Sequence, residues 1–223
     1  MSSTALALAE DKMPAHLQKV EGVGRGNENV GSHLAIPRVK LLQKMSDEVD
    51  KHSPGYVKGA EAGDFINTLT NNIYGEEMYV LSITFKNEFV VWRKREAGGG
   101  FLGNYPSHAE AQAAVDETDK PEDYDITETH SHLLLIKDPK TGELEASPAI
   151  MDFASSKLRI SRNWNSQIGM KGGDRFAGLW KLKSQAVENR MGNAFMNLDV
   201  EFVGWAQEED YRVAESLYEQ HAQ

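Results

Sequence analysis

A regular alternation of side chains over residues 79–94 constrains the fold of this chain more than any other feature. Residues 79–85 carry bulky apolar side chains at every second position, and residues 89–94 continue the alternation. A period of two is expected of a half-buried β-strand. The intervening residues 86–88 form either a tight turn or a bulge within one long strand. The chain is therefore expected to be built mainly from strands.

Two hairpins are expected further along the chain. Residues 132–137 (HLLLIK) form a short buried strand, and the turn signal at 138–142 (DPKTG) returns the chain through Leu144 towards Ile150. Residues 179–187 and 195–205 flank a glycine-containing turn at 190–193 and form the second hairpin. The segment 38–45 is compatible with either a strand or a short helical turn.

Three helices are expected between and after these strands. Ser107 can cap an alanine-rich helix that runs to Val115. A second helix begins at a cap provided by Asp152 or Ser155 and ends before Gly169; its apolar stripe comprises Phe153, Ile160, Trp164 and Ile168. A third, acidic helix lies within residues 206–223. The fold class is thus mainly β with inserted helices, an OB-fold-like antiparallel five-stranded barrel, with an α+β sandwich as the alternative.

The domain organisation follows from composition. Residues 1–35 contain four glycines in a polar stretch and are expected to be a flexible N-terminal segment. Residues 36–205 form the OB-like domain, within which the acidic stretch 110–128 is expected to be a surface loop. Residues 206–223 follow as the acidic C-terminal helix.

Charge is distributed in blocks along the chain. The net charge is −10, from 24 Lys and Arg against 34 Asp and Glu, which taken alone argues against nucleic acid. Residues 110–128 carry eight carboxylates and one lysine, and residues 199–223 carry seven carboxylates and one arginine. Residues 151–190 carry eight cations and three carboxylates. Two acidic blocks therefore alternate with basic ones, the smaller basic block being residues 93–95.

The absence of cysteine excludes several site types. There is no cysteine in the chain, so disulfides, zinc–thiolate sites, iron–sulfur clusters and cysteine catalysis are excluded. No apolar run approaches the ~20 residues of a membrane-spanning helix, and the first residues lack the basic start of a signal peptide. A protein of the reducing cytoplasm is expected, with no cofactor and no contact with membranes.

Basic and aromatic residues are interleaved in both basic blocks. Single-strand binders need cations along the phosphates and exposed rings that stack on bases. The candidate nucleic-acid-binding residues are Lys86, Trp92, Arg93, Lys94, Arg95, Phe101, Tyr105, Arg159, Arg162, Trp164, Lys171, Arg175, Lys181 and Lys183. The opposing interpretation is that strand aromatics belong to the core and strand lysines to the solvated surface. On a strand, Lys181 and Lys183 share one face, opposite Trp180.

The other motifs give weak support for a phosphate-binding, metal or catalytic site. The glycine loops 98–100 and 172–173 lie beside the basic blocks but match no phosphate-binding loop. His130 and His132 would point to the same side of a strand, yet a lone H-x-H pair without a third ligand is weak support for a metal site. No nucleophile elbow is present. Neither a catalytic residue nor a metal ligand is assigned, and no enzyme is expected.

Several strings resemble a phage family. They are IPR (36–38), LLQ (41–43), WR (92–93), GGGF (98–101), SRNWNS (161–166), GGDRF (172–176) and FMNLDV (195–200). Together they are similar to single-stranded-DNA-binding proteins of OB-fold type from tailed bacteriophages, over residues 36–218. The resemblance implies a groove for single-stranded DNA without sequence preference, and association with phage replication or recombination proteins. The chain departs from that pattern at its end (YEQHAQ), which lacks an Asp-Asp-Phe-like tail.

The expected function is therefore non-catalytic binding of single-stranded DNA, which protects or organises the strand in phage replication or recombination in the host cytoplasm. Homo-oligomerisation is left open. The alternative is a phage accessory protein that binds and inhibits a host protein through acidic, DNA-mimicking surfaces. A metal-dependent nuclease that uses His130, His132 and nearby acids is a more remote alternative.

Overall fold

The computed structural model describes residues 35–221, so the flexible segment expected at 1–35 lies outside the described residues except for its last position. Residues from Ile36 onward form one compact unit. None of the described helices is long and apolar enough to cross a lipid bilayer.

The unit is built on one nine-stranded sheet. Eight strands follow the order β3-β2-β1-β7-β6-β4-β8-β9, and the ninth, β5, pairs with β4. All neighbours are antiparallel except β1 and β7, which are parallel. The strands are β1 (Arg38–Leu41), β2 (Phe65–Asn67), β3 (Ile73–Gly75), β4 (Glu77–Arg93), β5 (Gly100–Tyr105), β6 (Tyr124–Lys137), β7 (Ala149–Ala154), β8 (Gly178–Glu188) and β9 (Ala194–Trp205).

Three α-helices and several short 3-10 helices complete the unit. The α-helices are α1 (His108–Asp116), α2 (Leu158–Lys171) and α3 (Glu208–His221). The 3-10 helices are η2 (Arg95–Ala97), η3 (Pro121–Asp123), η4 (Ser155–Lys157) and η5 (Arg175–Ala177). Ser107 caps α1 as expected, since its hydroxyl accepts a hydrogen bond from the Glu110 amide.

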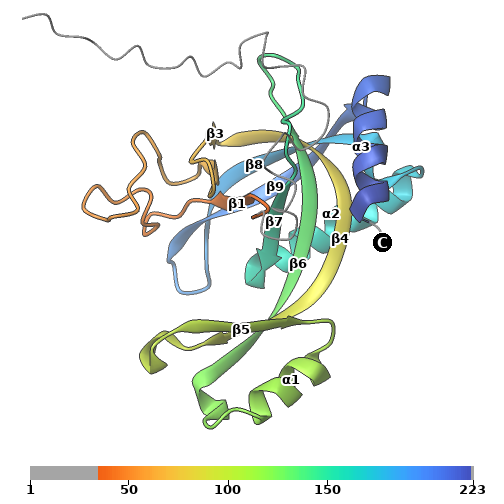
Figure 1. Ribbon diagram of the computed structural model, residues 1–223. Coiled ribbons are helices and arrows are strands. Elements are labelled where there is room, and N and C mark those ends of the chain that lie inside the picture. Colours follow the sequence, from red (N-terminus) through yellow and green to blue (C-terminus); the bar gives the residue numbers. More distant parts are fainter. Residues whose placement is uncertain (1–34, 222–223) are drawn as a thin grey trace, which may run out of the picture. The chain divides into compact units, whose positions relative to one another are not determined.

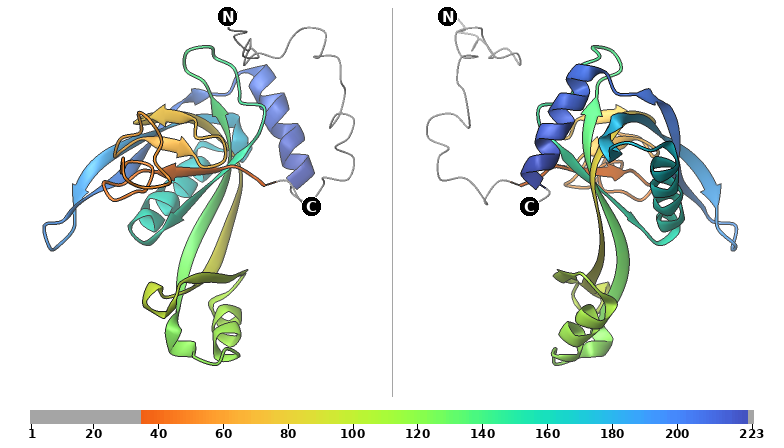
Figure 2. Two further views of the ribbon diagram at one scale, coloured as in Figure 1. Left: turned by 60° about the vertical axis from the view of Figure 1, so that its left-hand side comes forward. Right: turned by 90° about the vertical axis from the view of Figure 1, so that its right-hand side faces the viewer.

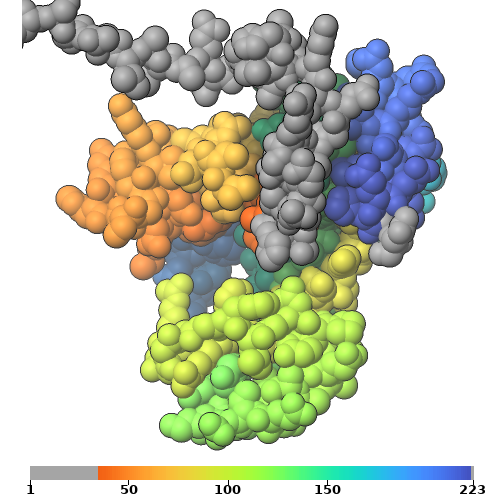
Figure 3. All heavy atoms as spheres, viewed as in Figure 1, coloured from red at the N-terminus to blue at the C-terminus, as the bar shows by residue number. Residues whose placement is uncertain are grey.

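Strand β4 is the backbone of the architecture. It is a single strand of 17 residues that pairs with β6 along its whole length, with β8 at its beginning and with β5 at its end. Its far end, together with β5, α1 and the start of β6, extends from the rest of the unit as an arm, here residues 86–128 (Figures 1 and 3). The arm has a small core of its own around Val91, Ala111 and Val115.

Helices α2 and α3 cover opposite faces of the sheet (Figure 2). The alternation along β6 sends Leu134 and Ile136 into the core that contains Trp164 of α2. The intervening Leu133 and Leu135 pack with Ala214 of α3 on the other face. The buried strands are therefore apolar on both faces, as a sheet covered on both sides requires.

The barrel prediction is confirmed only in its coarse form: the sheet curls into a half-barrel, but it has nine strands and is not a clean five-stranded OB barrel. The segment 38–45, which was compatible with either a strand or a helical turn, contains β1, and the residues up to Gly75 add β2 and β3 next to it. Within the described residues the end strands β3 and β9 do not pair with each other, so no barrel closes. The coarser prediction, a mainly β protein with inserted helices, is confirmed.

Three local predictions need correction. Residues 86–88 lie within one long strand, as one alternative predicted, but they pair in register with β6, and the bulge lies between Ser82 and Thr84. The supposed acidic loop 110–128 contains α1 and the start of β6, because Tyr124 and Ile126 pack into the arm core. Phe153 belongs to β7, and α2 starts later than expected and passes through Gly169 to end at Gly172, a left-handed glycine with φ 73°.

Candidate nucleic-acid interface

Two aromatic rings stand exposed side by side on the arm. Trp92 of β4 and Phe101 of β5 are cross-strand partners, with ring centroids 5.3 Å apart. Their exposed fractions are 49% and 57%. Because side chains alternate along β4, Val91 points into the arm core while Trp92 points to the opposite face. The pair therefore presents aromatic surface that no described residue covers.

These rings form one wall of a pocket of about 470 Å³ on the α3 side of the sheet. Three hydroxyl side chains of β6, those of Thr127, Thr129 and Ser131, line it because they share one strand face. We call the pocket with its two rings the aromatic face. A neighbouring pocket of about 220 Å³ shares Ser131 with it and adds Lys86.

One ion pair lies where the two pockets meet. Arg38 lines both pockets and binds Asp152, which also accepts a hydrogen bond from Ser131 at 2.6 Å. The arrangement offers ring surfaces, hydroxyl groups and two cations, Arg38 and Lys86, on one open face that also carries the carboxylates of Asp152 and Glu88. Arg38 and the β6 hydroxyls were missed by the sequence analysis, since only the pairing of β1, β7 and β6 brings them next to Trp92.

The basic cluster 93–95 lies at the end of the arm and is partly neutralised. Arg93 pairs with Asp123 at 3.4 Å. Lys94 donates to the Glu122 carbonyl oxygen at 2.7 Å and lies 3.8 Å from Asp125. Arg95 is exposed and forms no ion pair within residues 35–221. Of the three cations, only Arg95 is thus without a carboxylate partner in the described part of the chain.

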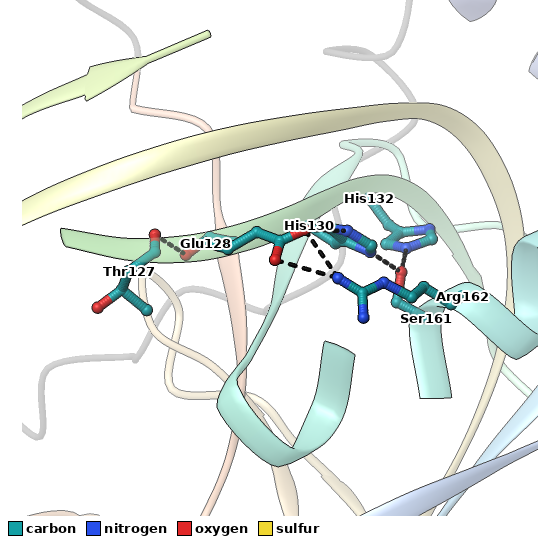
Figure 4. Close-up of polar contacts among 7 residues, drawn as sticks. Thr127, Glu128, His130, His132, Ser161 and Arg162 are labelled. Carbon is teal, nitrogen blue, oxygen red and sulfur yellow. Dashed lines mark hydrogen bonds and ion pairs between the residues drawn. The ribbon is translucent and has the colours of Figure 1, made fainter. Parts of the chain in front are cut away.

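A buried hydrogen-bond chain links β6 to α2 (Figure 4). The Ser161 hydroxyl lies 2.8 Å from His130 Nδ1 and 2.7 Å from His132 Nε2. All three residues are buried. His132 also stacks on Trp164, with centroids 4.6 Å apart. The H-x-H pair thus points to one side of its strand as predicted, but towards a helix rather than a metal ion.

The groups at the two ends of this hydrogen-bond chain, Arg175 and Glu128, determine which ring nitrogen of each histidine carries the proton. Arg175 donates to His132 Nδ1 at 3.2 Å, and since a guanidinium has no acceptor, the hydrogen of the neutral ring sits on Nε2. His132 then donates to Ser161, and Ser161 donates to His130 Nδ1. The remaining His130 N–H faces Glu128, whose carboxylate lies 3.5 Å away. Glu128 in turn accepts two hydrogen bonds from Arg162, at 2.9 and 3.0 Å.

Burial keeps both histidines neutral. It lowers the pKa of His130, and it lowers the pKa of His132 well below the usual range, with the positive charge of Arg175 adding to the effect. Burial also lowers the pKa of Arg175 to about 10. Among residues 35–221 no group of three or more acidic or histidine side chains is arranged to hold a metal ion. This buried hydrogen-bond chain is suited to fixing α2 on the sheet.

Two predicted stacking residues lie in packed environments. Trp164 is fully buried between His132, Phe153 and Trp180, so its ring has no surface left for a base. Tyr105 is half-buried and packs with the arm core. Arg175, predicted as a phosphate ligand, instead donates to Ser82 at 3.0 Å and to His132.

The remaining predicted cations are dispersed. Arg159 and Arg162 are exposed on α2, on the sheet side opposite to α3. Lys181 and Lys183 alternate with the core residues of β8, so they face away from α2, and they pair with Glu201 and Glu77. Lys171 lies 3.6 Å from the ring centre of Phe202. The tertiary structure thus distributes the predicted set over both sides of the sheet and the arm.

Comparison with known proteins gives one match. A family model described as Pam3 phage gp34-like protein matches residues 3–223. No curated protein and no solved structure matches the chain. The match supports the phage part of the resemblance, while the family description contains no DNA-binding term. The match spans nearly the whole sequence, and the chain therefore belongs to the Pam3 phage gp34-like protein family.

Proposed function

We propose that this protein binds single-stranded DNA on the aromatic face, without catalysis and without a cofactor. The observation that carries the proposal is the exposed pair of Trp92 and Phe101 beside a pocket of about 470 Å³. Large aromatic side chains are normally buried, and an exposed pair marks an interaction site. Stacking on such rings contributes about 1–3 kcal/mol per base and tolerates any sequence.

The groups around the rings suit a nucleic acid strand. Lys86 and Arg38 lie along the adjoining pocket, where they can neutralise phosphates, although Asp152 compensates Arg38. The hydroxyls of Thr127, Thr129 and Ser131 can exchange hydrogen bonds with bases or sugars. A non-catalytic role agrees with the full burial of Ser161, whose hydroxyl lies between His130 and His132.

Membership of a phage family supports a proposal about the biological setting. We propose that the protein protects or organises single strands during phage replication or recombination in the host cytoplasm, and that it acts beside phage replication or recombination proteins.

A second candidate function rests on the charge of the arm. Residues 86–128 contain five Lys and Arg against ten Asp and Glu, and Arg93 and Lys94 are neutralised internally. An acidic protrusion of this kind can bind a basic protein surface, as an inhibitor that mimics DNA would. Substitution of exposed arm carboxylates such as Asp119 and Glu122 would then weaken capture of the protein partner and leave DNA binding unchanged.

The decisive experiment measures fluorescence anisotropy of a labelled single-stranded oligonucleotide and of its duplex. The wild-type chain is expected to prefer the single strand, and the variant Trp92→Ala/Phe101→Ala to bind about tenfold or more weakly, as the loss of stacking implies. Trp205→Ala is the matched control, because this tryptophan is 57% exposed on β9, away from the arm. Equal affinity of the double variant and the wild type would refute the proposal.

A further inference from the structure

A second groove lies between α2 and the β8–β9 hairpin. Its volume is about 760 Å³, and three arginines line it: Arg159 and Arg162 of α2 and Arg190 of the hairpin turn. Four amide side chains accompany them, those of Asn163, Gln167, Gln185 and Asn197. Two carboxylates, Glu188 and Asp199, also line the groove. We call it the arginine groove.

The arginines differ in their availability. Arg162 is held by the two hydrogen bonds to Glu128 described above. Arg159 and Arg190 are exposed and pair with no carboxylate among residues 35–221. The groove lining carries three arginines against two carboxylates. Guanidinium groups can bind phosphate oxygens through two parallel hydrogen bonds, and the amide side chains add further donors.

The arginine groove and the aromatic face meet at the end of β7. Ala154, the last residue of β7, lines the aromatic face, while Ser155 and Ser156 line the arginine groove. Strand β1 pairs with β7 only at Ile150 and Met151, so within the described residues the outer edge of 152–154 carries no further strand. A single strand that occupied both pockets would have to cross this edge from one side of the sheet to the other.

We propose that the arginine groove binds the phosphate backbone of the same DNA strand whose bases stack on Trp92 and Phe101. This inference rests on the proposed function and assigns the strand a path over the end of β7. Arg159 and Arg190 are the phosphate ligands. The buried chain through Ser161 fixes α2, and with it Arg159, at the groove.

The test is a length series of single-stranded oligonucleotides, from about 4 to about 16 nucleotides, the range of site sizes of single-strand-binding folds. Wild-type affinity is expected to rise with length. Arg159→Ala/Arg190→Ala should bind the shortest oligonucleotides normally and the long ones about tenfold more weakly. Two lost phosphate contacts should also reduce the slope of log affinity against log salt by about 1.4 for long strands.

The control variant is Lys51→Ala/Lys58→Ala, which removes the same charge from exposed positions outside the groove. An equal loss of affinity in this variant would overturn the proposal, because it would indicate a general effect of charge. Wild-type behaviour of the arginine variant at every length would also overturn it, while a defect of Trp92→Ala/Phe101→Ala would leave the proposed function intact. Failure of the wild-type chain to bind any oligonucleotide would refute both.

Discussion

At the residue scale, the best-defined feature is the polar chain from Arg175 to Glu128. Each hydrogen bond in it has one direction of donation, because the guanidinium can only donate and the carboxylate can only accept. Buried polar groups are tolerated when all of them are satisfied, and such networks favour one arrangement of the elements they join. Here they join β6 to α2 and η5.

Because of the two histidines in this hydrogen-bond chain, we expect the stability of the protein to depend on pH. The folded state lowers the pKa of His130 and His132, so it binds fewer protons than the unfolded chain once the pH falls below about 6.5, the ordinary histidine value. The stability that the neutral chain contributes is complete above that pH and is lost progressively below it. Urea unfolding between about pH 7.5 and about pH 5.5 should show the decrease.

Variants separate this effect from general acid sensitivity. His132→Phe should reduce the dependence on pH, whereas His52→Ala, which removes an exposed histidine, should retain it. A wild-type stability that stays constant over this range would contradict the lowered pKa values of His130 and His132.

At the scale of elements, the arm depends on its helix. Helix α1 has only nine residues, and helices of that length are marginal without caps and tertiary packing. Val115 and Ala111 provide the packing against β4. The Ser107 side chain provides the cap and also donates a hydrogen bond to the Glu110 carboxylate at 2.8 Å.

Ser107→Ala is therefore expected to destabilise α1 by about 1 kcal/mol. Hydrogen exchange should show faster exchange of the α1 amides, with little change in β7 or β8. Ser166→Ala serves as the control, because this serine lies in the interior of α2 and caps nothing. Unchanged protection of α1 in the Ser107 variant would mean that the packing alone holds the helix.

At the scale of the whole unit, one apolar cluster unites most elements. It contains residues of β1, β2, β4, β6, β7, α2, β8 and β9, with Trp164 fully buried in it. The arm core is separate from this cluster. Unfolding of the sheet should therefore be governed by the shared cluster, and the arm should contribute less.

Trp164→Ala should lower the free energy of unfolding by about 3–5 kcal/mol, the range for deleting a large buried aromatic side chain. Chemical denaturation followed by circular dichroism would measure it. Trp205→Ala, which removes the same side chain from an exposed position, should change stability by less than about 1 kcal/mol. A loss for Trp164→Ala as small as that for Trp205→Ala would show that the α2 interface contributes little to the stability of the fold.

Short-range patterns predicted many elements well. The alternation in β4, the turn signals of both hairpins and the Ser107 cap all depend on neighbours within a few residues, and the structure has each of them. The start of α2 was misplaced, because Phe153 fits a helical stripe but is held in β7 by pairing with His130. Strands β1 to β3 are three or four residues long and were too short to give a pattern.

The sequence by itself determined the mainly β character, the two hairpins and the three helices, since these follow from local periodicity and turn and cap signals. Only the tertiary structure decided that the sheet stays open, that Trp92 and Phe101 are exposed while Trp164 is buried, and that His130, His132 and Ser161 meet. The physical reason is that periodicity assigns a side chain to a face, whereas the pairing of distant strands and the packing of helices decide whether that face is covered.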